Sequence, residues 1–421
     1  MSSFEYKNGA LHAEDVKLAD IAKSVGTPFY CYSKSEIELR FNSLQQVFAD
    51  MKPLIAYAVK ANSNQAIISL LGDLGAGADI VSLGELERAI AANINPKKII
   101  FSGVGKSKKE IKRALELGIH CFNLESLQEL ERLNNIANEL NLIANVSVRI
   151  NPDVDAKTHA KISTGKSENK FGISYLDANE VFAKIKAASN LKAIGLDMHI
   201  GSQIINLEPY DKAISLLAGL FTKLNNLGHN LEHIDIGGGL GISHGNNEKE
   251  PDILTFAQIV RTHLAPLKCK LIIEPGRWMV GNSGVLVAKV EYIKHSEKNN
   301  FVITDAAMND LLRPTLYEAH HDIFPLNKIP DDAVNFKADV VGPICESGDY
   351  FAQGRNLAPF KQDDLLAIMS AGAYGAVMAG TYNSRPLIAE VLVYQDDFKV
   401  IRKRQKLEDL IALDIIPNWS E

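Results

Sequence analysis

Between residues 54 and 274 the chain alternates repeatedly between short apolar runs, often β-branched, and longer stretches whose apolar residues recur at helical spacing. The eight runs are Leu54–Lys60, Gly77–Ser82, Lys98–Gly103, Ile119–Leu124, Asn145–Ile150, Ala193–Ile200, His233–Gly237 and Leu271–Glu274. A helix is expected after each of the first seven, among them Leu83–Ala92, Lys108–Leu117, Ser126–Leu140 and Pro209–Leu227. Strand–helix alternation predicts a parallel sheet, and eight such units fit a (β/α)8 TIM-type barrel better than an open doubly wound sheet.

The pattern changes after Arg277, where strand-like runs follow one another with few helices and frequent proline and glycine between them. These runs are Leu286–Tyr292, Phe301–Thr304, Ala338–Val341, Leu365–Met369 and Glu390–Tyr394. They predict a second, mostly antiparallel β-barrel or sandwich domain. We therefore expect residues 30–277 to form the barrel, and residues 1–29 and 278–421 to form the β domain together.

Composition narrows the class of protein. The chain has 421 residues, 46% hydrophobic and 23% charged, with a net charge of −6, as expected for a soluble two-domain protein without a nucleic-acid partner. No signal peptide or membrane-spanning run is expected. The four cysteines lie far apart, which predicts free thiols in a reducing, cytoplasmic setting and neither a disulfide framework nor a zinc site. They are Cys31, Cys121, Cys269 and Cys345.

Three predicted barrel strands have an ionisable residue at their carboxyl end. In (β/α)8 barrels the reactive groups lie at this end of the strands. Lys60 closes the first strand, His199 the sixth and Glu274 the eighth. A lysine directly after an apolar strand either extends its ammonium to solvent or serves as a Schiff-base lysine. His199 is likewise either a structural histidine or part of a site.

Glu274 follows an apolar run, so we expect it to be buried and to need a cationic partner. The partner of Glu274 is either Arg277, in a structural ion pair, or the protonated pyridine nitrogen of a bound cofactor. The seventh strand is followed by three glycines, which form either a flexible turn or a site where backbone N–H groups approach a phosphate. They are Gly237, Gly238 and Gly239.

The carboxyl-terminal half carries further polar clusters. Cys345 and Glu346 are adjacent in a turn-rich segment, and Tyr374 lies between two glycines. Arg313 and Tyr317 are four residues apart and face the same way if their segment is helical. Taken singly, each is also compatible with a surface loop or with packing.

Together these residues lie in seven motifs that resemble the pyridoxal 5'-phosphate (PLP)-dependent decarboxylases with an alanine-racemase-type barrel, and within them the enzymes that act on diaminopimelate. The resemblance covers nearly the whole chain. The motifs are Tyr57-Ala58-Val59-Lys60-Ala61-Asn62, His199-Ile200-Gly201-Ser202-Gln203, Gly237-Gly238-Gly239-Leu240-Gly241, Glu274-Pro275-Gly276-Arg277, Met308-Asn309-Asp310-Leu311-Leu312-Arg313-Pro314, Gly342-Pro343-Ile344-Cys345-Glu346-Ser347-Gly348-Asp349 and Tyr382-Asn383-Ser384-Arg385-Pro386.

The resemblance implies PLP as cofactor and gives each candidate a role. Lys60 would form the Schiff base with PLP, His199 would stack on its ring, and Glu274 would face its pyridine nitrogen. Cys345 would donate a proton to the substrate. Further cofactor-binding residues would be Ser202, Gly237, Gly238, Gly239, Gly276, Arg277 and Tyr374. The substrate-binding residues would be Arg277, Arg313, Tyr317, Glu346 and Tyr374.

The resemblance also implies a homodimer with shared active sites, in which Cys345 and Glu346 reach the partner's site. The implied reaction decarboxylates meso-2,6-diaminopimelate to L-lysine and CO2, the last step of lysine biosynthesis. Because a guanidinium suits a carboxylate, Arg313 together with Glu346 favours a substrate with both charges at its far end. The nearest alternative is a decarboxylase of the same fold for ornithine, arginine or a carboxylated polyamine. A racemase would have an arginine in place of Glu274, and an inactive homologue would lack Lys60 or Cys345.

Overall fold

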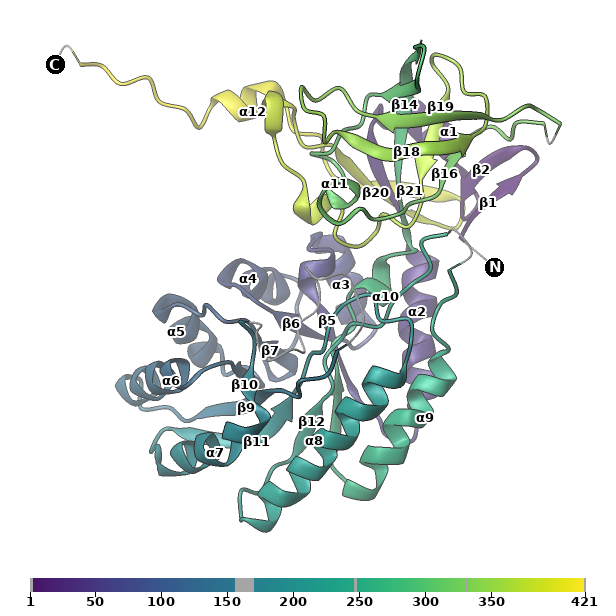
Figure 1. Cartoon of the computed structure of the whole chain (residues 1–421). Helices are drawn as coiled ribbons and strands as arrows, with labels where there is room; N and C mark the ends of the chain where they lie inside the picture. Colours follow the sequence, from purple (N-terminus) through teal and green to yellow (C-terminus); the bar gives the residue numbers. More distant parts are fainter. Residues whose placement is uncertain (1–2, 156–169, 246–247, 331, 420–421) are drawn as a thin grey trace. The chain divides into compact units, whose positions relative to one another are not determined.

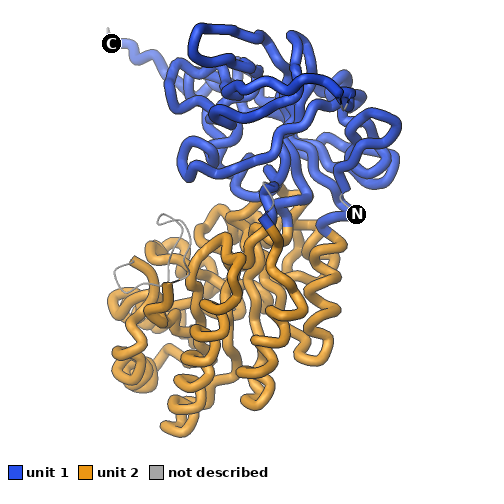
Figure 2. The backbone as a smooth tube through the Cα atoms, turned by 45° about the vertical axis from the view of Figure 1, so that its right-hand side comes forward, with its two compact units in different colours: residues 1–37, 243–248, 280–421 blue, residues 38–242, 249–279 orange. Residues whose placement is uncertain are grey.

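The computed structural model describes residues 3–155, 170–245, 248–330 and 332–419. The chain divides into two compact units (Figure 2). The barrel unit comprises residues 38–242 and 249–279, and the β unit comprises residues 1–37, 243–248 and 280–421. Within the described ranges, no helix has both the length and the apolar character needed to cross a bilayer.

Eight parallel strands close the barrel unit, which confirms the predicted (β/α)8 fold (Figure 1). In hydrogen-bonded order they are β5 (Leu54–Ala58), β6 (Gly77–Ile80), β7 (Ile99–Phe101), β8 (Cys121–Leu124), β9 (Ala144–Asn151), β11 (Leu191–Asp197), β12 (His233–Asp235) and β13 (Lys270–Ile273). The strand β13 pairs with β5 and completes the circle, and β10 (Ile173–Ser174) adds to β9. Nearly every strand residue is buried, because the helices cover the outside of the barrel and side chains fill its inside.

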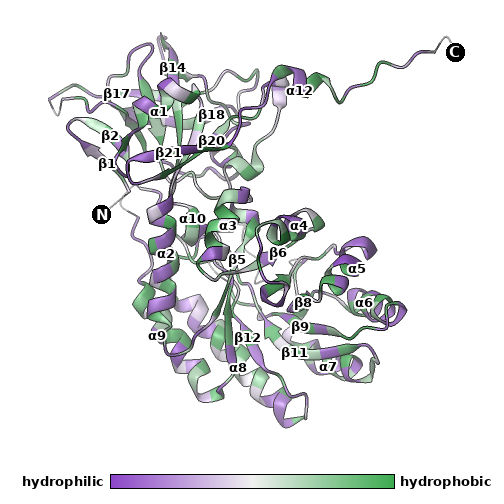
Figure 3. Cartoon of the chain, turned by 180° about the vertical axis from the view of Figure 1, so that it is seen from behind, coloured by the Kyte–Doolittle hydropathy of each residue, from purple (hydrophilic) through white to green (hydrophobic). Residues whose placement is uncertain are grey.

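The helices that follow the strands carry alternating apolar and polar stripes (Figure 3). Three of them begin at a serine whose hydroxyl accepts a hydrogen bond from the backbone N–H of a glutamate three residues later. These caps, at Ser82, Ser107 and Ser126, explain why the predicted helix starts were accurate. The helices are α2 (Lys34–Val47), α3 (Gln65–Asp73), α4 (Leu83–Ala91), α5 (Lys108–Leu117), α6 (Leu127–Glu139), α7 (Ala178–Ala187), α8 (Glu208–Asn226), α9 (Ile253–Leu264) and α10 (Arg277–Val280).

Several predicted strand ends lie two or three residues too far along the chain, and two of these errors concern candidate residues. The strand β5 stops at Ala58, and Lys60 lies in the short 3-10 turn Val59–Ala61. The strand β11 stops at Asp197, two residues before His199. Asp197 pairs with the last residue of β12, so this neighbour offers no further strand residue to β11. Both candidate residues therefore lie in the connections that follow the strands.

The β unit contains a mostly antiparallel sheet, as predicted, and a small three-stranded sheet, β1–β2–β3. The larger sheet has the order β18–β17–β15–β14–β4–β20–β21, with β19 also on β14 and β16 on β19. The strands are β1 (Phe4–Lys7), β2 (Ala10–Ala13), β3 (Val16–Lys17), β4 (Phe29–Ser33), β14 (Gly284–His295), β15 (Asn300–Thr304), β16 (Ile323–Pro325), β17 (Phe336–Val341), β18 (Tyr350–Leu357), β19 (Leu365–Ile368), β20 (Ala389–Tyr394) and β21 (Asp397–Arg402). Its helices are α1 (Leu18–Val25), α11 (Arg313–Tyr317) and α12 (Leu407–Ile411).

The boundary expected at residue 30 falls inside β4. This strand is buried along its whole length between β14 and β20, with Tyr30 opposite both Leu286 and Glu390. Because β4 is a central strand of the larger sheet, the barrel unit begins only after Ile37. Its other end lies at Met279, close to the expected residue 277.

Asp310 in the β unit gives the first testable prediction. Its side chain is buried and accepts a hydrogen bond from the backbone N–H of Ala307 at 2.9 Å. Burial raises the pKa of Asp310 to about 7. Between about pH 4 and 7 the folded chain keeps this proton and the unfolded chain does not, so stability falls by up to about 1.4 kcal/mol per pH unit as pH rises.

The variant Asp310→Asn cannot ionise and should escape this loss. We expect its melting temperature to exceed that of the wild type by more at pH 8 than at pH 5, as measured by thermal denaturation in matched buffers. A difference that is the same at both pH values would contradict the burial of an ionisable carboxyl group here.

Candidate active site

Lys60 and Asp79 form an ion pair at the carboxyl end of the barrel strands. Nζ of Lys60 lies 2.7 Å from Oδ2 of Asp79, and the lysine side chain is 36% exposed while the aspartate is fully buried. A buried carboxylate thus fixes the ammonium at the barrel edge while solvent still reaches it. Of the two alternatives for Lys60, this position therefore favours a Schiff-base lysine over one whose ammonium only extends to solvent.

Three carboxylates crowd the same end of the barrel. Asp197 ends β11, Asp235 ends β12 and Glu274 follows β13, and one oxygen from each lies within 4.8 Å of the others. All three side chains are buried. Burial, and then repulsion from Asp235, raise the pKa of both Glu274 and Asp197 well above their usual range. The cluster therefore retains protons unless a cation joins it.

Glu274 has an unsatisfied acceptor. Its Oε1 is buried, and no residue that the structure describes bonds to it. Among the residues that the structure describes, Glu274 forms no ion pair with Arg277. Nη2 of Arg277 instead donates to Oγ of Ser202 at 3.1 Å. Gly276 is buried between these two residues in the chain. A protonated ring nitrogen would supply both the donor and the charge that Oε1 lacks, so this end of the barrel fits the pyridinium of PLP.

His199 is oriented by the glycine turn. The backbone N–H of Gly238 donates to Nδ1 of His199 at 3.3 Å, which places the ring proton on Nε2. Burial, and then the positive charges of Arg149 and Lys60, lower the pKa of His199 well below its usual value. A neutral and oriented imidazole can lie against a flat cationic ring without repelling it.

The glycine turn after β12 is a tightly packed element. A Cβ at Gly237, Gly238 or Gly239 would collide with a backbone carbonyl of a neighbouring segment, so side chains are excluded at all three positions. The N–H groups of Gly237 and Gly238 already donate to side chains inside the barrel. No hydrogen bond within the described part of the chain uses the N–H of Gly239. Of the three expected phosphate donors, only Gly239 therefore has a backbone N–H that no described residue uses.

In the β unit, the segment with Arg313 and Tyr317 is helical, as α11. The Arg313 side chain is 5% exposed, and its Nη1 lies 2.7 Å from Nε2 of His321. Nδ1 of His321 lies 2.7 Å from the carbonyl oxygen of Met369 and donates to it, so Nε2 accepts from the guanidinium. His321, which sequence reasoning missed, therefore fixes the orientation of Arg313.

The segment after β17 presents two candidates to solvent. Cys345 and Glu346 are exposed, while Asp349 at the end of the same turn is buried. The backbone N–H of Cys345 donates to Oδ1 of Asn383 at 3.0 Å, which connects this turn to the 3-10 turn Tyr382–Ser384. Tyr374 is half-buried and has a left-handed backbone with φ of 55°, a conformation unusual for a tyrosine and often found at functional sites.

Several charged barrel residues were also not singled out from sequence. Arg149 on β9 neutralises part of the acidic cluster, with Nη1 at 2.8 Å from Glu125 and Nε at 3.9 Å from Asp197. Asp79 and Asp235 belong to the same group of buried charges. Each of these charged residues interrupts or ends an apolar strand. The same pattern indicated Lys60, so these residues could also have been found from the sequence.

Comparison with known proteins gives concordant matches. Residues 34–281 match the family described as pyridoxal-dependent decarboxylase, pyridoxal binding domain. Diaminopimelate decarboxylases of Pseudomonas aeruginosa and Zymomonas mobilis are each 48% identical, with 98% of both chains aligned for the first and 100% of both for the second. The crystal structure of diaminopimelate decarboxylase from Helicobacter pylori complexed with L-lysine is 44% identical and superposes with a TM-score of 0.90, covering 94% of this chain and 98% of that chain.

Proposed function

The chain belongs to the pyridoxal-dependent decarboxylase family, and from that premise we propose how its own residues bind PLP and select the substrate. Its reaction is the PLP-dependent decarboxylation of meso-2,6-diaminopimelate to L-lysine and CO2, the last step of lysine biosynthesis. The observation that carries this conclusion is 48% identity along essentially the whole chain to two diaminopimelate decarboxylases.

The barrel unit supplies the cofactor site. When bound, PLP takes up the electron pair left at Cα as the carboxylate departs. Nζ of Lys60 would hold the cofactor, the ring of His199 would lie against it, and Oε1 of Glu274 would accept a hydrogen bond from the ring N–H. Further contacts of the cofactor would come from Ser202, Gly239, Gly276, Arg277 and Tyr374. Gly237 and Gly238 would act by shaping the turn, because their N–H groups donate to Asp235 and His199.

The distal end of the substrate meets the residues of the β unit. Arg313, oriented by His321, and Tyr317 bind the distal carboxylate, and we propose Arg277 and Tyr374 as further substrate-binding residues. Glu346 binds the distal ammonium. A guanidinium held by a fixed partner offers parallel N–H donors that match a carboxylate. Ornithine and arginine lack this carboxylate, so they would leave the buried guanidinium of Arg313 without an anion.

The activity is tested directly with the PLP-loaded protein. Incubation with meso-2,6-diaminopimelate should release CO2 and L-lysine in equal amounts, while L-ornithine and L-arginine should release little CO2. Release of CO2 from ornithine or arginine but not from meso-diaminopimelate would keep the decarboxylase chemistry and overturn the substrate. We also propose that the reaction takes place in the cytoplasm, where the four unpaired cysteines remain reduced.

Glu274→Gln is expected to lower kcat by about 10²-fold while PLP remains bound. A neutral amide cannot balance a positive ring nitrogen, so the cofactor stabilises the developing charge at Cα less well. Both kcat per bound PLP and PLP content should be measured. Glu129→Gln is the control, since Glu129 is another buried barrel carboxylate but pairs with Lys106 at 2.7 Å. Equal losses in the two variants would mean that Glu274 has only a structural role.

The proton that replaces CO2 at Cα comes from the Sγ–H of Cys345, and we place Cys345 and Glu346 in the active site of a second copy of the chain. Both side chains are exposed, as expected for residues that reach a partner. The end of the chain also exposes a series of apolar side chains typical of an interface. They are Leu407, Ile411, Leu413, Ile415, Ile416 and Trp419.

A shared active site predicts complementation between two inactive variants. Lys60→Ala and Cys345→Ser should each be inactive alone, but a mixed dimer contains one site with both native residues. After equal amounts are mixed and allowed to exchange subunits, about one quarter of the wild-type activity should return. The control mixes Lys60→Ala with His199→Ala, because both defects lie in the same barrel. Equal recovery in the two mixtures, or none in the first, would contradict a shared site.

A further inference from the structure

The amino-terminal ends of β8 and β12 hold a second cluster of side chains. Cys121 is the first residue of β8, His120 precedes it, and His233 is the first residue of β12. Because the barrel strands run parallel, this end lies opposite the one that carries Lys60. The cluster is therefore separate from the proposed PLP site and does not depend on the proposed function.

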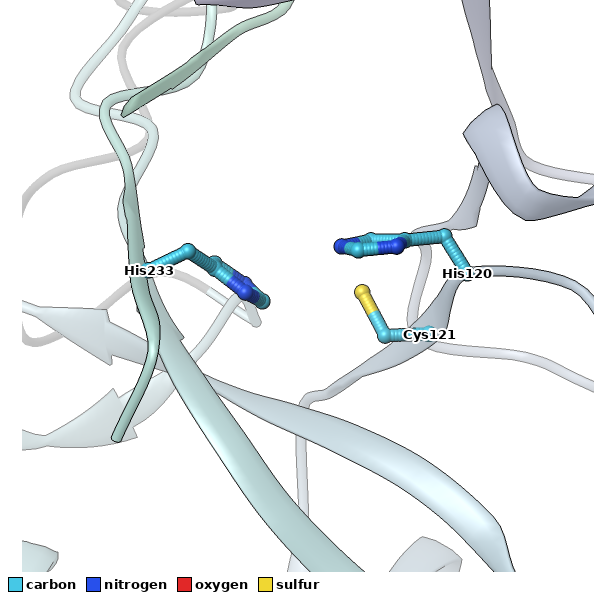
Figure 4. Close-up of side chains that lie close together, drawn as sticks. All are labelled: His120, Cys121 and His233. Atoms are coloured by element: carbon cyan, nitrogen blue, oxygen red, sulfur yellow. The ribbon is translucent and has the colours of Figure 1, made fainter. Parts of the chain in front are cut away.

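The three side chains point toward one another (Figure 4). An imidazole nitrogen of His120, one of His233 and Sγ of Cys121 all lie within 4.8 Å of each other, and the two ring centroids are 5.4 Å apart. The ring of His233 fits here because residue 195 is glycine, and a Cβ on Gly195 would overlap that ring. The fold thus makes room for an imidazole on the inside of the barrel.

Two nitrogen atoms of this cluster have no hydrogen-bond partner among the residues that the structure describes. They are Nε2 of His120 and Nε2 of His233, both buried, and the whole His233 side chain is only 1% exposed. A buried polar atom without a hydrogen bond is unfavourable, so each of these nitrogens would gain from binding a ligand.

The protonation states suit metal binding. Burial, and then the His120 ring, lower the pKa of His233 to about 3, and burial also lowers the pKa of His120, so both imidazoles are neutral at pH 7. Burial raises the pKa of the Cys121 thiol well above its usual value. Its partner in this structure is Oδ1 of Asn123, 3.8 Å from Sγ. A bound cation is what would favour the thiolate here.

We propose that His120, Cys121 and His233 bind one divalent transition-metal ion of the Zn²⁺ class. Two imidazole nitrogens and one thiolate select such an ion over Mg²⁺ or Ca²⁺, which require oxygen ligands. Metal–ligand bonds of about 2.0–2.3 Å place tetrahedral ligand atoms roughly 3.5 Å apart, so the three side chains need to close in by about 1 Å. As the metal–sulfur bond forms, the thiol proton passes to solvent, and a water molecule completes the fourth position.

The surroundings define how the site would behave. His120 is half-buried, so part of this residue is in contact with solvent, whereas Cys121 and His233 are buried. The positive charges of Lys97 and Lys270 oppose a cation near these rings, and Glu232 favours one. A bound ion would connect β8 to β12 and stabilise the folded barrel.

Cobalt provides the probe, because a thiolate bound to Co²⁺ gives a sulfur-to-metal charge-transfer band. The PLP-loaded protein, freed of metal by dialysis against a chelator, should bind one Co²⁺ per chain with this band, and Zn²⁺ should displace the Co²⁺. Cys121→Ser should lose the band and bind Co²⁺ at least tenfold more weakly (about 10–100-fold for a lost ligand contact). Cys269→Ser is the matched control in the same unit, and Cys345→Ser removes the exposed thiol; both should keep the band.

A second variant, His120→Asn, keeps the test valid if Cys121→Ser does not fold, because a half-buried position tolerates substitution. His120→Asn should weaken Co²⁺ binding to a similar extent. Zn²⁺ should also raise the melting temperature of the wild type but not that of Cys121→Ser. The proposal is overturned if the wild type shows no charge-transfer band. It is equally overturned if the band persists in Cys121→Ser and disappears in Cys345→Ser.

Discussion

Lys60→Ala is expected to lower kcat for lysine formation by at least about 10³-fold, since the residue that would hold the cofactor covalently is lost. The lost ammonium also leaves the buried carboxylate of Asp79 without the partner that lies 2.7 Å away in the wild type. We expect PLP to be removed from this variant by gel filtration, whereas the wild type retains it. Lysine production and the visible absorbance of bound PLP are the two measurements.

The control for this experiment is Lys98→Ala. Lys98 belongs to the same barrel and donates to the backbone carbonyl of Gly75 at 2.9 Å, so its loss tests the effect of removing a lysine in general. Lys98→Ala should keep both activity and PLP. If Lys60→Ala retained PLP and formed lysine at a similar rate, Lys60 would be a solvent-facing lysine with no role in the chemistry.

Arg313→Ala is expected to lower kcat/KM for meso-diaminopimelate by roughly 10²- to 10³-fold, with most of the effect on KM. Truncating one partner of a buried, hydrogen-bonded charge pair costs about 2–5 kcal/mol, and the substrate carboxylate would then face no fixed cation. Arg313→Lys should recover only part of the loss, because an ammonium lacks the parallel donors of a guanidinium. His321→Asn should cause a smaller rise in KM, since it removes the acceptor that orients Arg313.

The control for Arg313 is Arg404→Ala in the same β unit, where the guanidinium donates to the backbone carbonyls of Gly26 and Pro28. Steady-state kinetics with meso-diaminopimelate should show little change in KM for this variant. If Arg313→Ala kept the wild-type KM, the distal carboxylate would have to bind elsewhere. If that variant instead gained activity toward ornithine, Arg313 would be confirmed as the residue that selects the substrate.

The barrel was predictable from sequence because its signals are local. Each strand is a short apolar run, and serine caps such as Ser107 determine where the helices begin. A helix or a strand depends on residues within one or two turns, and a parallel arrangement follows from their alternation. The identity of Lys60, His199 and Glu274 as candidates also followed from local position, at or just past the end of an apolar run.

The pairing of distant segments was not predictable in this way. The strand β4 lies between β14 and β20, far away in the chain, and nothing in the local pattern of Phe29–Ser33 distinguishes a barrel strand from a sheet strand. The exact strand ends depended on neighbours too, because β11 stops where β12 offers no further partner. These errors displaced Lys60 and His199 by only two residues, so the chemistry inferred for them did not change.

The sequence alone determined the fold class, the resemblance to PLP-dependent decarboxylases and the residue types available for chemistry. Only the tertiary structure decided which charges share one environment: the buried acids around Glu274, the histidine that fixes Arg313, and the grouping of His233 with Cys121 across the barrel. The physical reason is that pKa values, hydrogen bonding and metal affinity depend on burial and on distances of a few ångströms. Those distances arise between segments that are far apart in the chain, so the spacing of residues in the sequence does not contain them.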